Sequence, residues 1–226
     1  MGALHQAVYP CNRNTTPLAM PNSKPNIGLT LDQTLEQLAE GNHRFRDGRP
    51  LHRDPKIERQ ATCDTQEPFA AVLSCIDSRV PVERVFDQGL GELLSTRVAG
   101  NVVSNDILGS LEFGCEVVGA KLIVVMGHTK CRAIHNACDG LEFGHMTALL
   151  ERIRVAVRST VVPEDPKQRT SQNATFVADV TQRNIELAIT SIRERSNILR
   201  DLEDSGSIAI VGALYDIETG GVEFQC

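Results

Sequence analysis

The sequence predicts an α/β fold: a mostly parallel central sheet flanked by helices, with an antiparallel strand at one edge and a helical arm at the N-terminus. First, short apolar runs typical of strands buried on both faces alternate with longer segments of helical periodicity. Second, an apolar fraction of 41% in 226 residues is enough for a substantial core. Third, a Thr-Gly-Gly turn near the C-terminus joins two strand candidates as a hairpin.

The N-terminal part of the chain is predicted to contain one helix and two irregular stretches. Residues 1–28 are rich in proline and are predicted to form a flexible tail, whereas residues 29–226 are predicted to form a single domain. Thr30 is a candidate N-cap for a helix that runs to about Arg46, with leucines along one stripe. Residues 49–67 are polar, and we expect an irregular segment there.

The rest of the chain alternates between apolar runs bounded by polar residues and segments with helical spacing of apolar residues. The strands predicted from the apolar runs are, in chain order, 69–75, 93–98, 121–126, 207–214 and 222–224. The helices predicted from the periodic segments are 104–118, 141–159 and 175–203. No internal repeat is visible, and the pattern therefore favours one α/β domain.

Composition and charge exclude several classes of function. With 23 basic and 29 acidic residues the net charge is -6, which repels nucleic acid, and no tryptophan is present for base stacking. No run approaches the roughly 18 apolar residues of a membrane span. The seven cysteines are an odd number spread along the chain, which favours thiols in a reducing compartment over a disulfide framework. The N-terminus has no signal-peptide pattern, and a cytoplasmic location is predicted.

Residues that bind metals follow two of the predicted buried strands. Cys75 follows the first, and His128 and Cys131 follow the third. Because the carboxyl ends of parallel strands meet at one edge of a sheet, these three side chains can converge if the strands are neighbours. Two thiolates and an imidazole suit tetrahedral zinc and leave a fourth position open. A zinc ion there would lower the pKa of a bound water toward roughly 7.

Asp77 and Arg79 lie beside this candidate site and leave two arrangements open. The Asp77 carboxylate either binds the metal in the fourth position, which closes the site, or accepts a hydrogen bond from the bound water. Arg79, two residues along the chain, can hold that carboxylate through a bidentate pair. The sequence therefore predicts a zinc site that is open when Asp77 pairs with Arg79 and closed when it binds the metal.

A rival metal cluster is also present in the sequence. Cys131, His135 and Cys138 have the spacing i, i+4, i+7, which places them on one face of a helix. This alternative leaves Cys75 and Asp77 without a role.

The spacing Cys75-x-Asp77-Ser78-Arg79, followed by His128-x-x-Cys131, resembles the zinc signature of the β-class carbonic anhydrases. The similarity covers most of the chain from the first predicted helix to the end. Further segments that look like this family are Glu40-Gly-Asn42, Val80-Pro81, Phe86-Asp-Gln88-Gly, Arg97-Val-Ala-Gly-Asn101, Gly109-Ser-Leu-Glu-Phe113 and Gly212-Ala-Leu-Tyr215. The combination is far more specific than any one motif.

The resemblance implies a zinc lyase, a carbonate dehydratase. Its implied site has one zinc ion per chain, the ligands Cys75, His128 and Cys131, and a catalytic dyad of Asp77 and Arg79. Gln88 matches a glutamine that, in one branch of the family, donates a hydrogen bond to substrate across a dimer interface. The implied reaction is reversible hydration of CO2 to bicarbonate and a proton by zinc-bound hydroxide, in a homodimer or homotetramer whose N-terminal helices embrace the neighbouring subunit.

Arg132 departs from the family pattern, which has glycine after the second cysteine. Its side chain can fill the pocket, bind an anion such as bicarbonate, change the local turn, or point away without effect. Arg132 and Gln88 are therefore the candidate substrate-binding residues. The alternative function is a catalytically impaired zinc-binding homologue that acts as a bicarbonate-binding or assembly subunit. A hydrolase for carbonyl sulfide or carbon disulfide ranks last, because no sulfur-specific feature is present.

Overall fold

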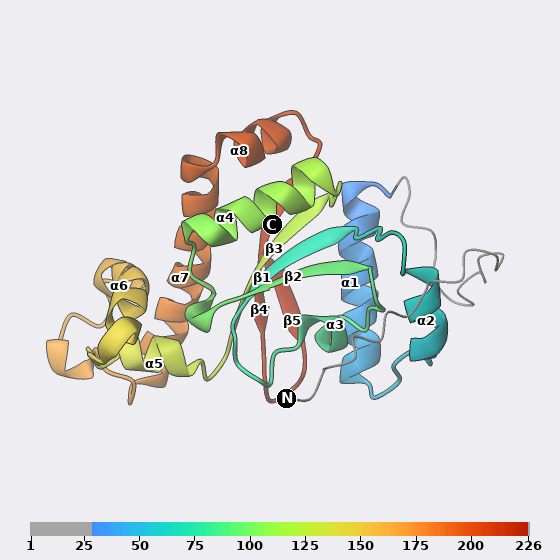
Figure 1. The fold of residues 1–226 in the computed structure, drawn as a ribbon. Helices are drawn as coiled ribbons and strands as arrows, with labels where there is room; N and C mark the ends of the chain where they lie inside the picture. The colour runs from blue at the N-terminus through green and yellow to red at the C-terminus, as the bar shows by residue number, and fades with distance from the viewer. Residues whose placement is uncertain (1–28, 226) are drawn as a thin grey trace, which may run out of the picture.

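A computed structural model describes residues 29–225, which form a five-stranded sheet with helices on both faces (Figure 1). The strands, in the order β2-β1-β3-β4-β5 across the sheet, are β2 Leu93–Arg97, β1 Ala70–Ser74, β3 Leu122–His128, β4 Ala209–Tyr215 and β5 Val222–Gln225. The first four are parallel, and β5 pairs antiparallel with β4. The predicted fold class is therefore confirmed. The predicted tail lies outside the described residues, and the division into a tail and a single domain stays a prediction.

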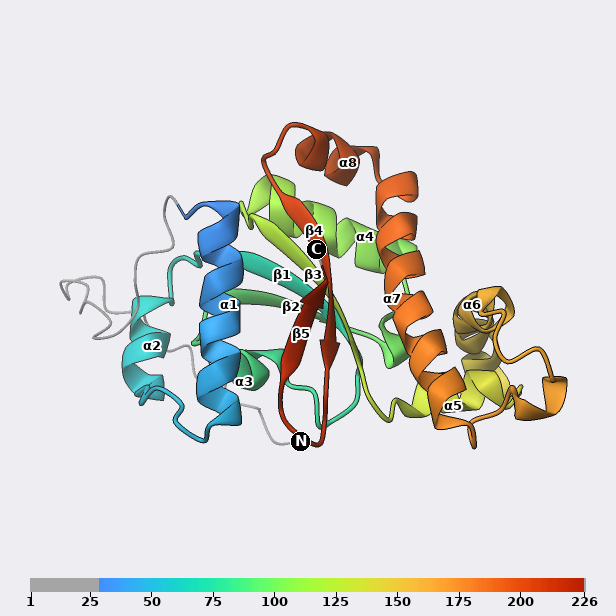
Figure 2. The ribbon, with the colours of Figure 1, turned by 180° about the vertical axis from the view of Figure 1, so that it is seen from behind.

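The helices occupy both faces of the sheet and the edge where the parallel strands end (Figure 2). They are α1 Leu31–Arg46, α2 Pro55–Ala61, α3 Val82–Val85, α4 Asn105–Glu112, α5 Arg132–Cys138, α6 Gly144–Ser159, α7 Ala174–Arg195 and α8 Asn197–Asp204. The short turns are the 3-10 helices η1 Ala99–Asn101 and η3 Pro166–Gln168 and the π-helical turn η2 Phe113–Val117, which extends α4. Among the described residues, no helix combines the length and apolar character that a membrane span needs.

The helix α1 begins at the predicted residue because Thr30 forms a capping box. The Thr30 hydroxyl accepts a hydrogen bond from the backbone N–H of Gln33, and the Gln33 side chain accepts one from the backbone N–H of Thr30. These two bonds satisfy N–H groups that a helix start leaves unpaired. Leu38 on the inner face of α1 is fully buried.

Two predictions of local structure were wrong. Residues 49–67 contain α2, which begins where the Asp54 carboxylate accepts a hydrogen bond from the N–H of Lys56 and Pro55 occupies the first turn. This helix has only seven residues, which is too short to show an apolar period. The single helix expected over residues 175–203 is divided at Ser196, which leaves the helical conformation and caps α8 through its hydroxyl.

The core lies on both faces of the sheet, as the continuous apolar runs predict. In β1, Ala71 and Leu73 pack with the cluster that includes residues of α4, α7 and α8. Ala70 and Val72 point to the opposite face, where they pack with residues of α1 and α3. A third cluster at the carboxyl ends of β1 and β3 is built from α5, α6 and α7, and it surrounds Cys75 and Cys131.

A buried ion-pair network holds α1 and the segment before α2 against the turn that follows α3. The Asp87 carboxylate accepts hydrogen bonds from Arg44, from Arg53 and from the backbone N–H of Leu51. Burial by itself would raise the pKa of Asp87, but these donors outweigh it and hold the pKa below its usual range. The network therefore stabilises the fold in its ionised state.

We expect Asp87→Asn to lower the free energy of unfolding by about 3 kcal/mol at pH 7, because it removes one partner of a buried ion pair. Asparagine tolerates the positive φ of 45° at this position, so the backbone is retained. A carboxyl whose pKa is depressed by folding contributes stability above about pH 4 and loses it as the pH falls through the folded value. Urea unfolding of both proteins should therefore give a smaller difference at about pH 3.5 than at pH 7. An equal difference at both pH values would contradict this assignment.

Candidate metal centre

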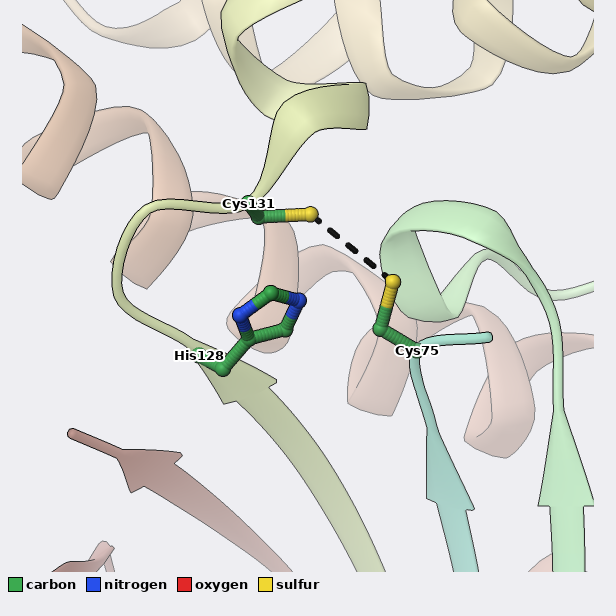
Figure 3. A group of neighbouring side chains, drawn as sticks. All are labelled: Cys75, His128 and Cys131. Atoms are coloured by element: carbon green, nitrogen blue, oxygen red, sulfur yellow. Dashed lines mark hydrogen bonds between the residues drawn. The ribbon is translucent and has the colours of Figure 1, made fainter. Parts of the chain in front are cut away.

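Three side chains meet at the carboxyl edge of the sheet, in the cluster of Cys75, His128 and Cys131 (Figure 3). Cys75 directly follows β1, His128 is the last residue of β3, and Cys131 precedes the first residue of α5. The two sulfur atoms are 3.9 Å apart, and the three potential ligand atoms all lie within 4.8 Å of one another. The residues are 3%, 1% and 2% exposed. Since β1 and β3 are hydrogen-bonded neighbours, the sheet itself brings the first two together.

The imidazole of His128 is prepared to bind a metal. Its Nδ1 lies 2.9 Å from the carbonyl oxygen of Thr129, which can only accept, so Nδ1 carries the proton and Nε2 has a free lone pair. Nε2 is buried and has no hydrogen-bond partner. A buried polar atom without a partner is costly unless a ligand satisfies it. Two thiol sulfurs beside this nitrogen form a donor set that fits zinc.

The turn from His128 to Cys131 depends on one strained residue. Lys130 has a φ of 57°, in the left-handed region that costs a residue with a side chain about 1–2 kcal/mol. The backbone N–H of Thr129 donates to the carbonyl of Tyr215 at the end of β4, and Lys130 forms an ion pair with Glu218. These contacts hold the turn that brings the Cys131 sulfur back toward Cys75.

The pKa values of the Cys75 and Cys131 thiols shift in opposite directions, so Cys75 carries the negative charge of the pair. Hydrogen bonding with Cys131 is the main reason that the pKa of Cys75 falls to about 4. His128 and the backbone N–H groups of Asp77 and Gly100 also lower it, and together they outweigh burial. The hydrogen bond to Cys75, burial and the adjacent negative charge all raise the pKa of Cys131. Without metal the pair therefore keeps one proton, and a metal that takes both sulfurs as ligands displaces it.

Asp77 is paired with Arg79 at the edge of this cluster. The Arg79 guanidinium donates to both carboxylate oxygens, at 2.9 and 2.8 Å, and the Arg79 backbone N–H donates to Oδ1. These hydrogen bonds are the main reason that the pKa of Asp77 falls to about 2. Oδ2 lies 4.0 Å from Nε2 of His128, so the carboxylate is a neighbour of the metal position.

The other two candidate residues lie outside the cluster. Gln88 is buried, and its amide donates to the carbonyl of Phe86 and accepts from Gln37 of α1. It lines a cavity of about 280 Å³ beside α1. Arg132 begins α5 with an exposed side chain, and it does not disturb the approach of Cys131 to Cys75.

The rival cluster of Cys131, His135 and Cys138 is not formed. These residues do lie on or beside α5, as the spacing predicts. In the described part of the chain, however, the group whose ligand atoms converge is that of Cys75, His128 and Cys131. Cys138 instead packs in the apolar cluster of α5, α6 and α7, where burial raises its pKa to about 11.

Residues that the sequence did not single out hold the backbone around Cys75. Arg97, the last residue of β2, donates to the carbonyls of Cys75 and Asp77 at 3.1 and 2.5 Å. Gly100 donates its N–H to the sulfur of Cys75, and Asn184 of α7 donates to the carbonyl of Gly100. Arg97 and Gly100 lie within a segment already noted for its family resemblance. No local sequence signal identifies Asn184, because its hydrogen-bond partner Gly100 is 84 residues away along the chain.

Comparisons with known proteins place the chain in a family. The family model described as carbonic anhydrase matches residues 70–222. Carbonic anhydrase 2 of Mycobacterium tuberculosis strain H37Rv is 34% identical to this chain, in an alignment that covers 89% of this chain and 93% of that protein. A carbonic anhydrase of Mycolicibacterium smegmatis is also 34% identical, over 91% of this chain and 96% of its own.

Solved structures share the fold at lower identity. A tetrameric β-carbonic anhydrase of Sordaria macrospora has a TM-score of 0.64 and 22% identity, over 72% of this chain and 82% of that chain. A Coccomyxa β-carbonic anhydrase in complex with acetazolamide has a TM-score of 0.65 and 22% identity, over 74% and 76% of the two chains. At this identity the likeness shows the fold alone.

We expect Cys131→Ser to remove most of the bound zinc, because serine replaces one soft sulfur ligand and leaves too few donors for a tetrahedral site. Cys138→Ser is the matched control, since Cys138 lies on the same helix and outside the cluster. Metal analysis of the purified proteins should give one zinc per chain for the parent protein and the control, and much less for Cys131→Ser. Full zinc content in Cys131→Ser would contradict the assigned ligand set.

Proposed function

Because the chain belongs to the β-class carbonic anhydrase family, we propose that it catalyses the zinc-dependent, reversible hydration of CO2 to bicarbonate and a proton. The single observation that carries the proposal is the buried, partnerless Nε2 of His128, which lies among two cysteine sulfurs and beside a paired carboxylate. A zinc ion held by two thiolates and one imidazole keeps a fourth position for water and lowers its pKa toward about 7, which supplies a nucleophile for CO2 at neutral pH.

The chain's own residues would orient the reactants. The carbonyl of Thr129 holds the His128 ring in the tautomer that presents Nε2, and the turn through Lys130 places Cys131 opposite Cys75. Burial in the cluster of α5, α6 and α7 excludes bulk water from the sulfur ligands. A dry, preformed set of ligands does not have to reorganise when the substrate arrives.

Asp77 is proposed to act as a hydrogen-bond acceptor in this reaction. Arg79 keeps the carboxylate ionised and turned to one side, and an ionised carboxylate can only accept. In that position, 4.0 Å from Nε2 of His128, the carboxylate would accept a hydrogen bond from a water molecule in the fourth metal position rather than occupy that position itself. Loss of the Arg79 pair would free Asp77 to close the site as a fourth ligand.

The alternative function is an impaired homologue that binds bicarbonate or supports assembly. The two functions differ in whether the side chain of Arg132 blocks catalysis. The exposed side chain of Arg132 supports catalysis, since the cluster beneath it keeps its geometry. We assign Arg132 to the rim of the site, where a guanidinium can attract bicarbonate without filling the metal position. The hydrogen bonds of Gln88 are with Phe86 and Gln37, which lie outside the metal cluster. The proposed hydrogen bond from Gln88 to substrate would therefore be made at the site of a second subunit.

A homodimer or homotetramer is the proposed assembly. The relative from Sordaria macrospora, which shares this fold, is described as tetrameric. A cytoplasmic location stays a prediction.

We expect the zinc-loaded protein to hydrate CO2 rapidly in a stopped-flow assay, and Arg132→Gly to change the rate by less than about tenfold, because the Arg132 side chain is exposed and acts at most through its charge. A large gain in Arg132→Gly over a slow parent protein would instead support the impaired homologue. No turnover by either protein, with one zinc per chain confirmed, would reject the proposed function. Parallel assays with carbonyl sulfide should give a negligible rate.

We expect Asp77→Asn to lower kcat for CO2 hydration by about tenfold to a hundredfold, the usual effect of losing a hydrogen-bond partner beside a metal site. Asparagine keeps the shape and loses the charge that pairs with Arg79. Zinc content should be unchanged, because Asp77 is not one of the three permanent ligands. Asp216→Asn, which alters another carboxylate near the His128 turn, is the control and should keep the parental rate. Equal effects of the two substitutions would argue against a specific role for Asp77.

A further inference from the structure

The sulfur of Cys75 has a backbone hydrogen-bond donor of its own. The N–H of Gly100 lies 3.3 Å from Sγ of Cys75, inside the buried cluster. Gly100 belongs to η1, the light green turn beside Cys75 in Figure 3. A hydrogen bond to a thiolate withdraws electron density from the sulfur, and such bonds tune how strongly a ligand donates to its metal.

The direction of this N–H depends on an unusual backbone. Gly100 has φ 68° and ψ 23°, in the left-handed region that glycine adopts without a steric penalty. A Cβ at this position would lie 2.4 Å from Cδ1 of Ile153 in α6, which is too close for a side chain. A side chain here would therefore strain the left-handed backbone and displace the tip of Ile153, and both constraints are independent of the metal.

The buried side-chain amide of Asn184 holds the carbonyl group of Gly100. Nδ2 of Asn184 in α7 donates to the carbonyl oxygen of Gly100 at 2.9 Å, and Asn184 is 5% exposed. Its neighbours on the inner face of the helix, Ile185 and Ala188, are apolar core residues. An amide among them is costly to bury unless its hydrogen bonds are made, so the hydrogen bond to the carbonyl of Gly100 stabilises Asn184 in this position.

We propose that Asn184 is a positioning residue for the metal centre, which holds the carbonyl of Gly100 so that the N–H of Gly100 stays directed at the sulfur of Cys75. The inference rests on the metal site and the function proposed above. With the hydrogen bond in place, Cys75 donates less charge to the metal, and the metal becomes a stronger Lewis acid. Without it, Cys75 becomes a more basic and less constrained ligand.

The test compares Asn184→Leu, which keeps the branched shape of the side chain and has no donor, with the parent protein. Cobalt(II) replaces zinc as the probe, and the sulfur-to-cobalt charge-transfer band is recorded. We expect the band to move to lower energy, because a thiolate without its hydrogen bond is easier to oxidise. Competition with a chelator at pH 7 should show a loss of apparent zinc affinity of about tenfold, because the more basic sulfur of Cys75 keeps its proton more tightly and is less well positioned. The midpoint of the pH profile of kcat should move to higher pH, since a weaker Lewis acid lowers the pKa of water less.

Thr181→Val is the matched control. Thr181 is one turn earlier on α7, equally buried, and its hydroxyl bonds within the helix to the carbonyl of Val177. This substitution removes a buried hydrogen bond from the same helix and leaves Gly100 untouched. We expect the parental cobalt band, zinc affinity and pH midpoint, even if thermal stability falls.

Gly100→Ala is a second route to the same effect, because a Cβ strains the left-handed backbone that directs the N–H and also contacts Ile153. Both variants should shift the cobalt band in the same direction. A parental band and zinc affinity in folded Asn184→Leu would overturn the proposal, as would an equal shift in Thr181→Val. These outcomes are separate from failure of the proposed function, which would appear as a parent protein that binds metal and does not hydrate CO2.

Discussion

The parallel pairing of β1 with β3 is the constraint on which the rest of this structure depends. The register that places Leu73 beside Val125 brings the ends of both strands to one edge of the sheet. Cys75 leaves the first strand there, and His128 ends the second. Because both strands are buried on both faces, their register is specified by the packing of two apolar clusters. A slip of either strand would separate the ligands and mismatch the packing of the two apolar clusters, so the fold and the metal site depend on the same register.

The backbone around the site is held from several directions, and this explains how soft ligands can be prepared in advance. Arg97 holds the carbonyls of the loop after β1, Gly100 donates to the sulfur of Cys75, and Thr129 fixes the tautomer of His128. Each contact comes from a different element of the fold. The Asp77–Arg79 pair then keeps a charged carboxylate beside the metal position without placing it on the ligands.

Much of the fold was predictable because local signals and tertiary packing agree. The capping residue Thr30, the apolar run 122–126 of β3 and the glycine turn before β5 are each visible in a few neighbouring residues, and each was predicted. The errors lie where local signals are weak. The helix α2 has too few residues to show a period, and Ser196 interrupts a helical pattern that continues on both sides. Its hydroxyl donates to Glu112, a contact that no local pattern predicts.

The local sequence was enough to place the five strands and the longer helices along the chain and to identify the three candidate ligands, because strand ends and residue types are local properties of the chain. Only the tertiary structure decided how those ligands are held. It orients His128 with Nε2 free, pairs Asp77 with Arg79, and brings Asn184 of α7 to Gly100 across 84 residues. The physical reason is that hydrogen bonds between distant segments depend on how helices pack on the sheet. That packing is fixed by the whole core, so no single stretch of sequence records it.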